Sequence, residues 1–159
     1  MSEQGKLDVK PLNVNDTIRH LVQNLSPILM QKGANVKLNL CNAEPVMKTD
    51  EFHFTNIIYN LIDNALKYTT ESPVIEITTD CDEHHIMVSV RDNGLGIRKE
   101  EQKNIFKRFY RISTGNIHNV RGFGLGLYYT KTILKRLKGD IKVLSAPGRG
   151  SNFSITFNI

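Results

Sequence analysis

Apolar residues recur every three or four positions in three stretches of the chain, residues 15–33, 50–69 and 125–139. This spacing gathers the apolar side chains on one side of an α-helix, as in a helix that packs on a core. Asp50 is a suitable N-cap for the second helix, because its carboxylate can accept free amide N–H groups of the first turn. Pro27 is expected to kink or split the first helix, since proline lacks an amide N–H. The pattern predicts three main helices.

A second pattern, in which apolar and polar residues alternate, predicts β-strands. It covers residues 35–40, 74–80 and 84–92, and it recurs as two strands within residues 140–159. Residues 74–80 and 84–92 are joined by a short polar turn and are expected to form a hairpin.

Three stretches carry weaker patterns. Residues 7–15 resemble a strand, and Pro11 restricts it to an edge of the sheet. Residues 99–109 resemble a helix, whereas residues 111–124 lack any period and are expected to form a mobile loop. Because strands occur in pairs as well as between helices, we predict an α+β fold with helices packed on one face of a mixed sheet.

The composition, 40% hydrophobic and 23% charged, indicates one globular domain over residues 1–159. No apolar run has the length of a membrane span. The net charge of +5 suits an anionic partner, but the interleaving of basic and aromatic residues that would indicate nucleic acid is absent. Cys41 and Cys81 lack metal-binding or CxxC spacing and are expected to be reduced thiols.

A line of asparagines runs along the second predicted helix. Asn56, Asn60, Asn64 and Lys67 follow one another at intervals of four, four and three residues and therefore share one face. An ordinary solvent-facing stripe is one interpretation, although such stripes usually carry better helix formers than asparagine. The other is a binding face, in which an amide oxygen holds Mg²⁺ and the lysine balances phosphate charge.

Two glycine clusters follow. In DNGLGI, Asp92 to Ile97, a carboxylate comes directly after an apolar strand and requires a hydrogen-bond donor, for which the exocyclic amine of adenine is suitable. Gly94 and Gly96 would let a base approach the backbone, although a simple strand-ending turn fits the same residues.

The second cluster, GFGLGL, spans Gly122 to Leu127 and precedes the third predicted helix. Its spacing matches neither the dinucleotide fingerprint nor the phosphate loop of other nucleotide-binding folds. A glycine-rich turn at a helix N-terminus still offers N–H groups to a phosphate, and it could also serve as the hinge of a lid.

In order along the chain stand NLIDNALKYT, DNGLGI, the aromatic stretch IFKRFYR, a loop and GFGLGL. This series resembles the N, G1, F and G2 boxes of the catalytic and ATP-binding domain of bacterial sensor histidine kinases, a branch of the Bergerat-fold ATPases. The resemblance covers essentially the whole chain. It implies a two-layer α/β sandwich, with three main helices on a mixed five-stranded sheet and with ATP and Mg²⁺ bound between helix and lid.

The resemblance also implies roles for individual residues. Asn64 is expected to hold Mg²⁺, and Asn60 and Lys67 to face the phosphates. Tyr68 is expected near the base and sugar. Arg111 would meet the terminal phosphate, which makes Asn60, Lys67 and Arg111 the expected catalytic residues.

The remaining roles concern the base and the lid. Asp92 is expected to accept a hydrogen bond from the adenine amine, with Gly94, Gly96 and Ile97 completing the base pocket. Phe106 and Phe109 would pack beneath the lid. The residues expected to close on the phosphate chain are Gly122, Gly124, Leu125, Gly126 and Leu127.

Relatives that hydrolyse ATP carry a glutamate base one turn before the metal-binding asparagine, where this chain has Asn60. We therefore expect a kinase that transfers the γ-phosphoryl group to a histidine, whose free ring nitrogen needs no base. Asp63 is the alternative base, although it lies about 100° around the helix from Asn64. A Bergerat-fold ATP hydrolase or switch, a serine kinase of a small regulatory protein, and a degenerate nucleotide-binding module are the alternative functions.

None of the five histidines is followed by an acidic residue, as the acceptor of this family is. The resemblance therefore implies an acceptor on a separate helical hairpin of a longer, homodimeric parent kinase, with a response regulator downstream. The domain itself is expected to be monomeric and cytoplasmic, and the parent to be anchored in the bacterial inner membrane.

Overall fold

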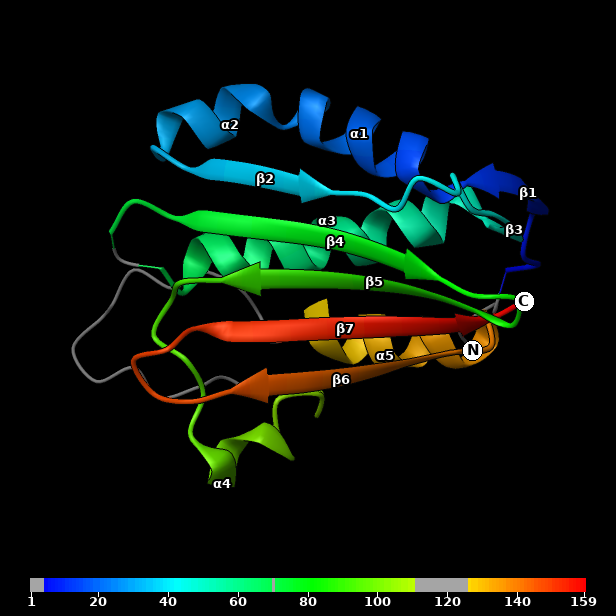
Figure 1. Ribbon diagram of the computed structural model, residues 1–159. Helices are drawn as coiled ribbons and strands as arrows, with labels where there is room; N and C mark the ends of the chain where they lie inside the picture. The colour runs from blue at the N-terminus through cyan, green and yellow to red at the C-terminus, as the bar shows by residue number, and fades with distance from the viewer. Residues whose placement is uncertain (1–4, 70, 111–125) are drawn as a thin grey trace.

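The computed structural model describes residues 5–69, 71–110 and 126–159, which form two layers (Figure 1). One layer is a five-stranded sheet in the order β2-β4-β5-β7-β6. Its strands are β2 (Asn35–Asn39), β4 (Val74–Cys81), β5 (His85–Asp92), β7 (Ser151–Asn158) and β6 (Gly139–Ser145). β2 runs parallel to β4, and the other neighbours are antiparallel. The expected mixed sheet and the β4–β5 hairpin are thus confirmed.

Helices form the second layer, on one face of the sheet (Figure 1). They are α1 (Val14–Asn24), α2 (Ser26–Gln31), α3 (Glu51–Lys67) and α5 (Gly126–Arg136). α1 and α2 are the two parts of the first predicted helix, which is split as Pro27 predicts, because the proline occupies the first turn of α2. α3 begins as expected, since the Asp50 side chain accepts the amide N–H of His53 at 3.0 Å.

The core lies between α3 and the sheet. Every apolar residue on one face of α3 is buried: Phe54, Ile57, Ile58, Leu61, Ile62, Ala65 and Leu66. Alternate residues of the facing strands are buried in the same way, as the pleat of a strand requires; the rings of Phe54 and Phe157 lie 5.8 Å apart. None of the described helices is sufficiently long and apolar to cross a bilayer.

The N-terminal strand differs from the sequence prediction. β1 (Val9–Asn13) lies outside the main sheet and pairs with β3 (Val46–Asp50) in a separate two-stranded sheet. β3 was not predicted, because Lys48, Thr49 and Asp50 are polar and hide its alternation, although Thr49 and Asp50 are buried. Pro11 is tolerated because β1 has a single strand neighbour.

The predicted helix over residues 99–109 is wrong beyond its first turn. α4 covers only Lys99–Gln102 and is followed by a series of tight turns. Phe109 has a φ of 63°, which no α-helix accommodates. Two apolar residues of this stretch instead pack on the core: Ile105 is buried, and the ring of Phe106 meets that of Phe153 edge-on at 6.5 Å. Tertiary packing decides the conformation here.

Candidate functional site

One end of the molecule brings together five of the residues singled out in the sequence. The C-terminal end of α3, the end of β5 and the start of β7 meet there, at the left in Figure 1. The residues that line one narrow pocket at this end are Asn64, Tyr68, Asp92, Gly96, Ile97, Ser151 and Phe153. A purine would enter only after neighbouring side chains move apart. Residues from three distant parts of the sequence therefore build one site.

Asp92 is the charged group of this pocket. Its Oδ1 accepts the amide N–H of Gly94 at 2.8 Å and that of Ser151 at 3.3 Å. Its Oδ2 has no hydrogen-bond partner among the described residues and remains available to a donor in the pocket. Burial raises the pKa of Asp92, and the two amide hydrogen bonds oppose this effect. The carboxylate is thus held by hydrogen bonds to one oxygen, while the other has no described partner, and a carboxylate in this state is suited to accept a hydrogen bond from an amine.

The glycines of the DNGLGI segment have a structural role in this fold. A Cβ on Gly94 would lie 2.7 Å from the carbonyl oxygen of Tyr68, and one on Gly96 would lie 1.9 Å from that of Ala146. Gly96 also has a φ of 74°. These glycines therefore allow the segment to pack against the end of α3 and against the β6–β7 turn. This packing is a second reason for glycine at these positions, besides the close approach of a base.

The β6–β7 turn supports the pocket. Its contact with the pocket was not predicted from the sequence. Gly150 lies so close to Asp92 that a Cβ would stand 2.0 Å from the Asp92 carbonyl oxygen. Ser145 Oγ accepts the amide N–H of Ile97 at 2.7 Å and lies 2.8 Å from Ser151 Oγ. The only local signal was the pair of glycines in APGRGS, residues 146–151, which indicates a turn but not its partner.

The asparagine stripe of α3 borders the pocket. Asn64 lines it, and the Asn60 side chain lies about 4 Å from the position of a Cβ on Gly126, at the start of α5. Both side chains are half-buried, and neither forms a hydrogen bond with another described residue. Two amides that no described residue engages in a hydrogen bond therefore lie at the pocket and beside it.

Lys67 is paired within its own helix. Its Nζ lies 2.8 Å from Asp63 Oδ2, and both side chains are about one-third exposed (33% and 31%). The carboxylate of Asp63 thus holds the ammonium group one turn away. This pairing favours a role for Asp63 in orienting Lys67 over a role as a base.

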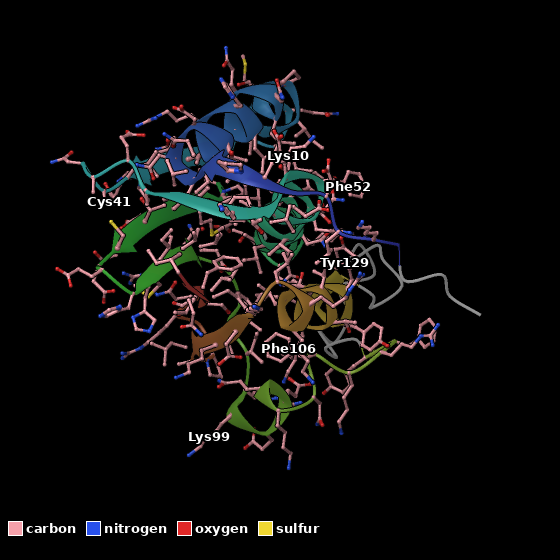
Figure 2. The ribbon with its side chains drawn as sticks, turned by 90° about the vertical axis from the view of Figure 1, so that its right-hand side faces the viewer. Lys10, Cys41, Phe52, Lys99, Phe106 and Tyr129 are labelled. Atoms are coloured by element: carbon pink, nitrogen blue, oxygen red, sulfur yellow. The ribbon has the colours of Figure 1, made fainter. Side chains whose placement is uncertain are left out.

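The aromatic stretch divides between core and surface. Phe106 packs on Phe153, whereas Phe109 is 61% exposed and lies under the guanidinium of Arg108, 5.0 Å from it. Phe109 is not among the residues lining the pocket. Figure 2 shows Phe106 between α4 and α5.

The lid prediction falls largely outside the described residues, and so do Arg111, Gly122, Gly124 and Leu125. Gly126 is the first residue of α5 and is exposed, and Leu127 packs against the core. The described part of the GFGLGL segment therefore leads into a helix, as its pattern predicts.

Known sequences place the chain in a family. Residues 49–159 match the family of histidine kinase-, DNA gyrase B- and HSP90-like ATPases. The sensor protein RprX of Bacteroides fragilis is 39% identical over 155 residues, which are 96% of this chain and 30% of RprX. The signal transduction histidine-protein kinase ArlS of Staphylococcus haemolyticus is 31% identical over 151 residues. The chain spans about a third of the length of these relatives (30% and 33%).

Solved structures show the same fold. The catalytic domain of histidine kinase ThkA superposes with a TM-score of 0.83 at 22% identity, over 96% of this chain and 98% of that one. Full-length ShkA in complex with AMPPNP gives a TM-score of 0.82 at 24% identity, over 96% of this chain and 31% of that one. The α+β sandwich predicted from the resemblance is thereby confirmed, and the chain belongs to the family of histidine kinase-, DNA gyrase B- and HSP90-like ATPases.

Proposed function

We propose that this chain is the catalytic domain of a sensor histidine kinase, which binds Mg-ATP and transfers its γ-phosphoryl group to a histidine on another domain. The observation that carries the proposal is the half-buried carboxylate of Asp92, which lines one pocket together with Asn64 and whose Oδ2 has no hydrogen-bond partner among the described residues. Family membership, the histidine-protein kinase ArlS among the relatives and the AMPPNP complex of ShkA support ATP as the ligand.

The base would be held by one polar and several apolar contacts. Asp92 Oδ2 accepts a hydrogen bond from the adenine amine, which distinguishes adenine from guanine because guanine carries a carbonyl at that position. Ile97, which is 4% exposed, and Phe153 supply apolar surface for the ring. Tyr68 lines the same pocket. Cofactor sites are typically apolar clefts with a small number of polar groups in fixed positions.

The residues of α3 fit a magnesium ion. Among the described residues there is no cluster of three or more His, Cys, Asp and Glu side chains that could enclose a metal. Mg²⁺ suits a site with a single amide ligand, since the ion keeps several waters and takes few protein ligands together with phosphate oxygens. The side-chain amide of Asn64, which has no hydrogen-bond partner among the described residues, is the ligand in our proposal, and the ion would neutralise phosphate charge.

Phosphoryl transfer would depend on position and charge. Asn60 and Lys67 orient the phosphate chain, and Arg111 meets its terminal phosphate. The free ring nitrogen of the acceptor histidine attacks the γ-phosphorus, the bond to the β–γ bridging oxygen breaks, and ADP leaves. Because Asn60 cannot accept a proton, water is poorly activated at this site and the histidine is the favoured nucleophile.

We propose further that the parent protein is a homodimeric, membrane-anchored kinase. Its acceptor histidine lies on a helical hairpin, and a response regulator receives the phosphoryl group. RprX and ArlS, which are about three times as long as this chain, support a parent protein longer than the chain.

The proposal is tested by following the terminal phosphate. The chain is incubated with Mg²⁺ and ATP labelled on the γ-phosphate, with and without the helical hairpin of the full-length kinase. We expect label on the hairpin that is stable in base and lost in acid, as a phosphohistidine is. Steady release of free phosphate without the hairpin would instead identify a hydrolase.

Replacing Asn64 by alanine is expected to make ATP binding insensitive to Mg²⁺. The wild type should bind ATP more tightly in Mg²⁺ than in EDTA. Asn64→Ala should bind ATP under both conditions with the affinity that the wild type has in EDTA, since the amide ligand is gone. Calorimetry with and without Mg²⁺ measures this. Asn56→Ala, on the same face of α3 but two turns away, is the control and should retain the dependence. An unchanged Mg²⁺ effect in Asn64→Ala would exclude this residue as the ligand.

Asp63→Asn is expected to retain label transfer within about threefold. The substitution removes an ion pair that is partly exposed, and such pairs contribute about 0–1 kcal/mol. Lys67→Gln removes the cation itself and should weaken ATP binding more. Label transfer and ATP affinity are measured for both variants. Loss of transfer with intact binding in Asp63→Asn would mean that this carboxylate is a base.

A further inference from the structure

Two thiols lie next to one another at the end of the sheet opposite the pocket. Cys41 follows β2 and Cys81 ends β4, and their Sγ atoms are 3.5 Å apart. Both residues are half-buried. Cys41 is labelled in Figure 2, on the side of the molecule that faces the viewer there. A sulfur–sulfur bond is about 2.05 Å long, so bond formation requires the two sulfurs to approach by roughly 1.5 Å.

The backbone at both cysteines is held by hydrogen bonds. The amide N–H of Cys41 donates to Thr79 Oγ1 at 2.9 Å, and its carbonyl oxygen accepts from Asn15 Nδ2 at 2.8 Å. Thr79 Oγ1 in turn donates to Asn15 Oδ1 at 2.8 Å, and Asn15 and Thr79 are both buried. Cys81 is paired with Ile86 across the β4–β5 ladder. The two thiols are therefore kept together by the fold, and their side-chain torsions provide the remaining movement.

We propose that Cys41 and Cys81 are a redox-active pair that forms a reversible intramolecular disulfide on exposure to hydrogen peroxide. One thiol attacks the peroxide and becomes a sulfenic acid, with release of one water. The second sulfur attacks the sulfenic sulfur, the S–S bond forms and a second water leaves. The two thiols lose two electrons and two protons, which the peroxide takes up. A dithiol reductant reverses the step by thiol–disulfide exchange.

The protonation of Cys81 affects the rate at which this thiol can react. The hydrogen bond to Cys41, together with burial and the carboxylates of Asp80 and Asp82, raises the pKa of Cys81. The thiolate is the reactive form. Attack of Cys81 on the peroxide is therefore expected to be slow at neutral pH.

The disulfide should stabilise the domain without altering its pocket. It would close a loop of about 40 residues, which restricts the unfolded chain and should raise Tm by about 5–10 °C. Along the β4–β5 ladder, Cys81 pairs with Ile86 and Ile75 pairs with Asp92. This separation is about 20 Å at the usual rise of a strand. ATP affinity should therefore change by less than about twofold.

The test uses the reduced chain, treated with hydrogen peroxide and then alkylated. We expect loss of both free thiols, a mass lower by two hydrogen atoms, a peptide that joins the two cysteines, and a raised Tm that dithiothreitol reverses. Cys41→Ser and Cys81→Ser are the controls, since each retains one thiol that has no intramolecular partner. Two thiols that remain alkylatable, or that gain oxygen at the rates seen in the single-cysteine variants, would overturn the proposal. This outcome is independent of histidine kinase activity.

Discussion

Asp92→Asn is expected to weaken ATP binding by about 10- to 100-fold and to leave the fold intact. Asparagine retains an oxygen that can accept from Gly94 and Ser151, as Asp92 Oδ1 does. Its amino group then replaces Oδ2 and meets the adenine amine, so that two donors face one another. An unpaired buried donor costs about 1–3 kcal/mol, and 1.4 kcal/mol is a tenfold change in affinity.

The stability of the same variant provides a second measurement. Since burial raises the pKa of Asp92 above its ordinary value of 3.8, the folded state holds this proton more tightly than the unfolded state. The corresponding stability is complete below pH 3.8 and is lost as the pH rises through the raised pKa. Asparagine never ionises. At neutral pH, Asp92→Asn should therefore unfold at the wild-type temperature or above it.

The measurements are calorimetry with ATP and thermal unfolding at pH 7. Asp140→Asn, an exposed carboxylate on β6, is the matched control and should change neither quantity. Equal ATP affinity of the wild type and Asp92→Asn would exclude the assigned base pocket. A Tm far below that of the wild type would show that the carboxylate supports the fold itself.

Gly96→Ala is expected to destabilise the domain by about 2–5 kcal/mol. A Cβ at this position would stand 1.9 Å from the Ala146 carbonyl oxygen, so the β6–β7 turn must shift. The positive φ of 74° adds strain to any L-residue, and strain and overpacking cost about 1–3 kcal/mol each. Tm should fall by roughly 5–15 °C.

Gly148→Ala separates these two causes. Gly148 has a φ of 75°, nearly that of Gly96, but no atom lies within 4 Å of its would-be Cβ. It should carry the strain without the clash, and its Tm should fall less. Equal losses in the two variants, measured by thermal unfolding, would show that backbone strain alone accounts for the effect.

Local pattern was sufficient for most of the fold. The apolar face of α3, its Asp50 cap and the break at Pro27 depend on neighbours within a few residues, and all three were predicted. The five strands of the main sheet followed from alternation in the same way. β3 and residues 103–109 were missed because their conformation depends on distant partners, β1 and Phe153.

The residues of the site were predicted only where they lie in the sequence motifs. Asn64, Tyr68, Asp92, Gly96 and Ile97 were identified in the sequence and lie together at the pocket. Ser145, Gly150 and Ser151 were not identified, because a turn of small residues gives no sign of the carboxylate it contacts 59 residues away. Arg111 and the glycines of the lid remain predictions.

The contact between Asp92 and Ser151 also has a consequence for folding during synthesis on the ribosome. The pocket needs the last strand, so α3 and β5 can be synthesised and paired before any base-binding geometry exists. A ligand that binds only the native state stabilises only a chain that has already reached that state. ATP in the cell therefore cannot guide the early folding of this domain. Its stabilising effect begins once β7 has left the exit tunnel and docked.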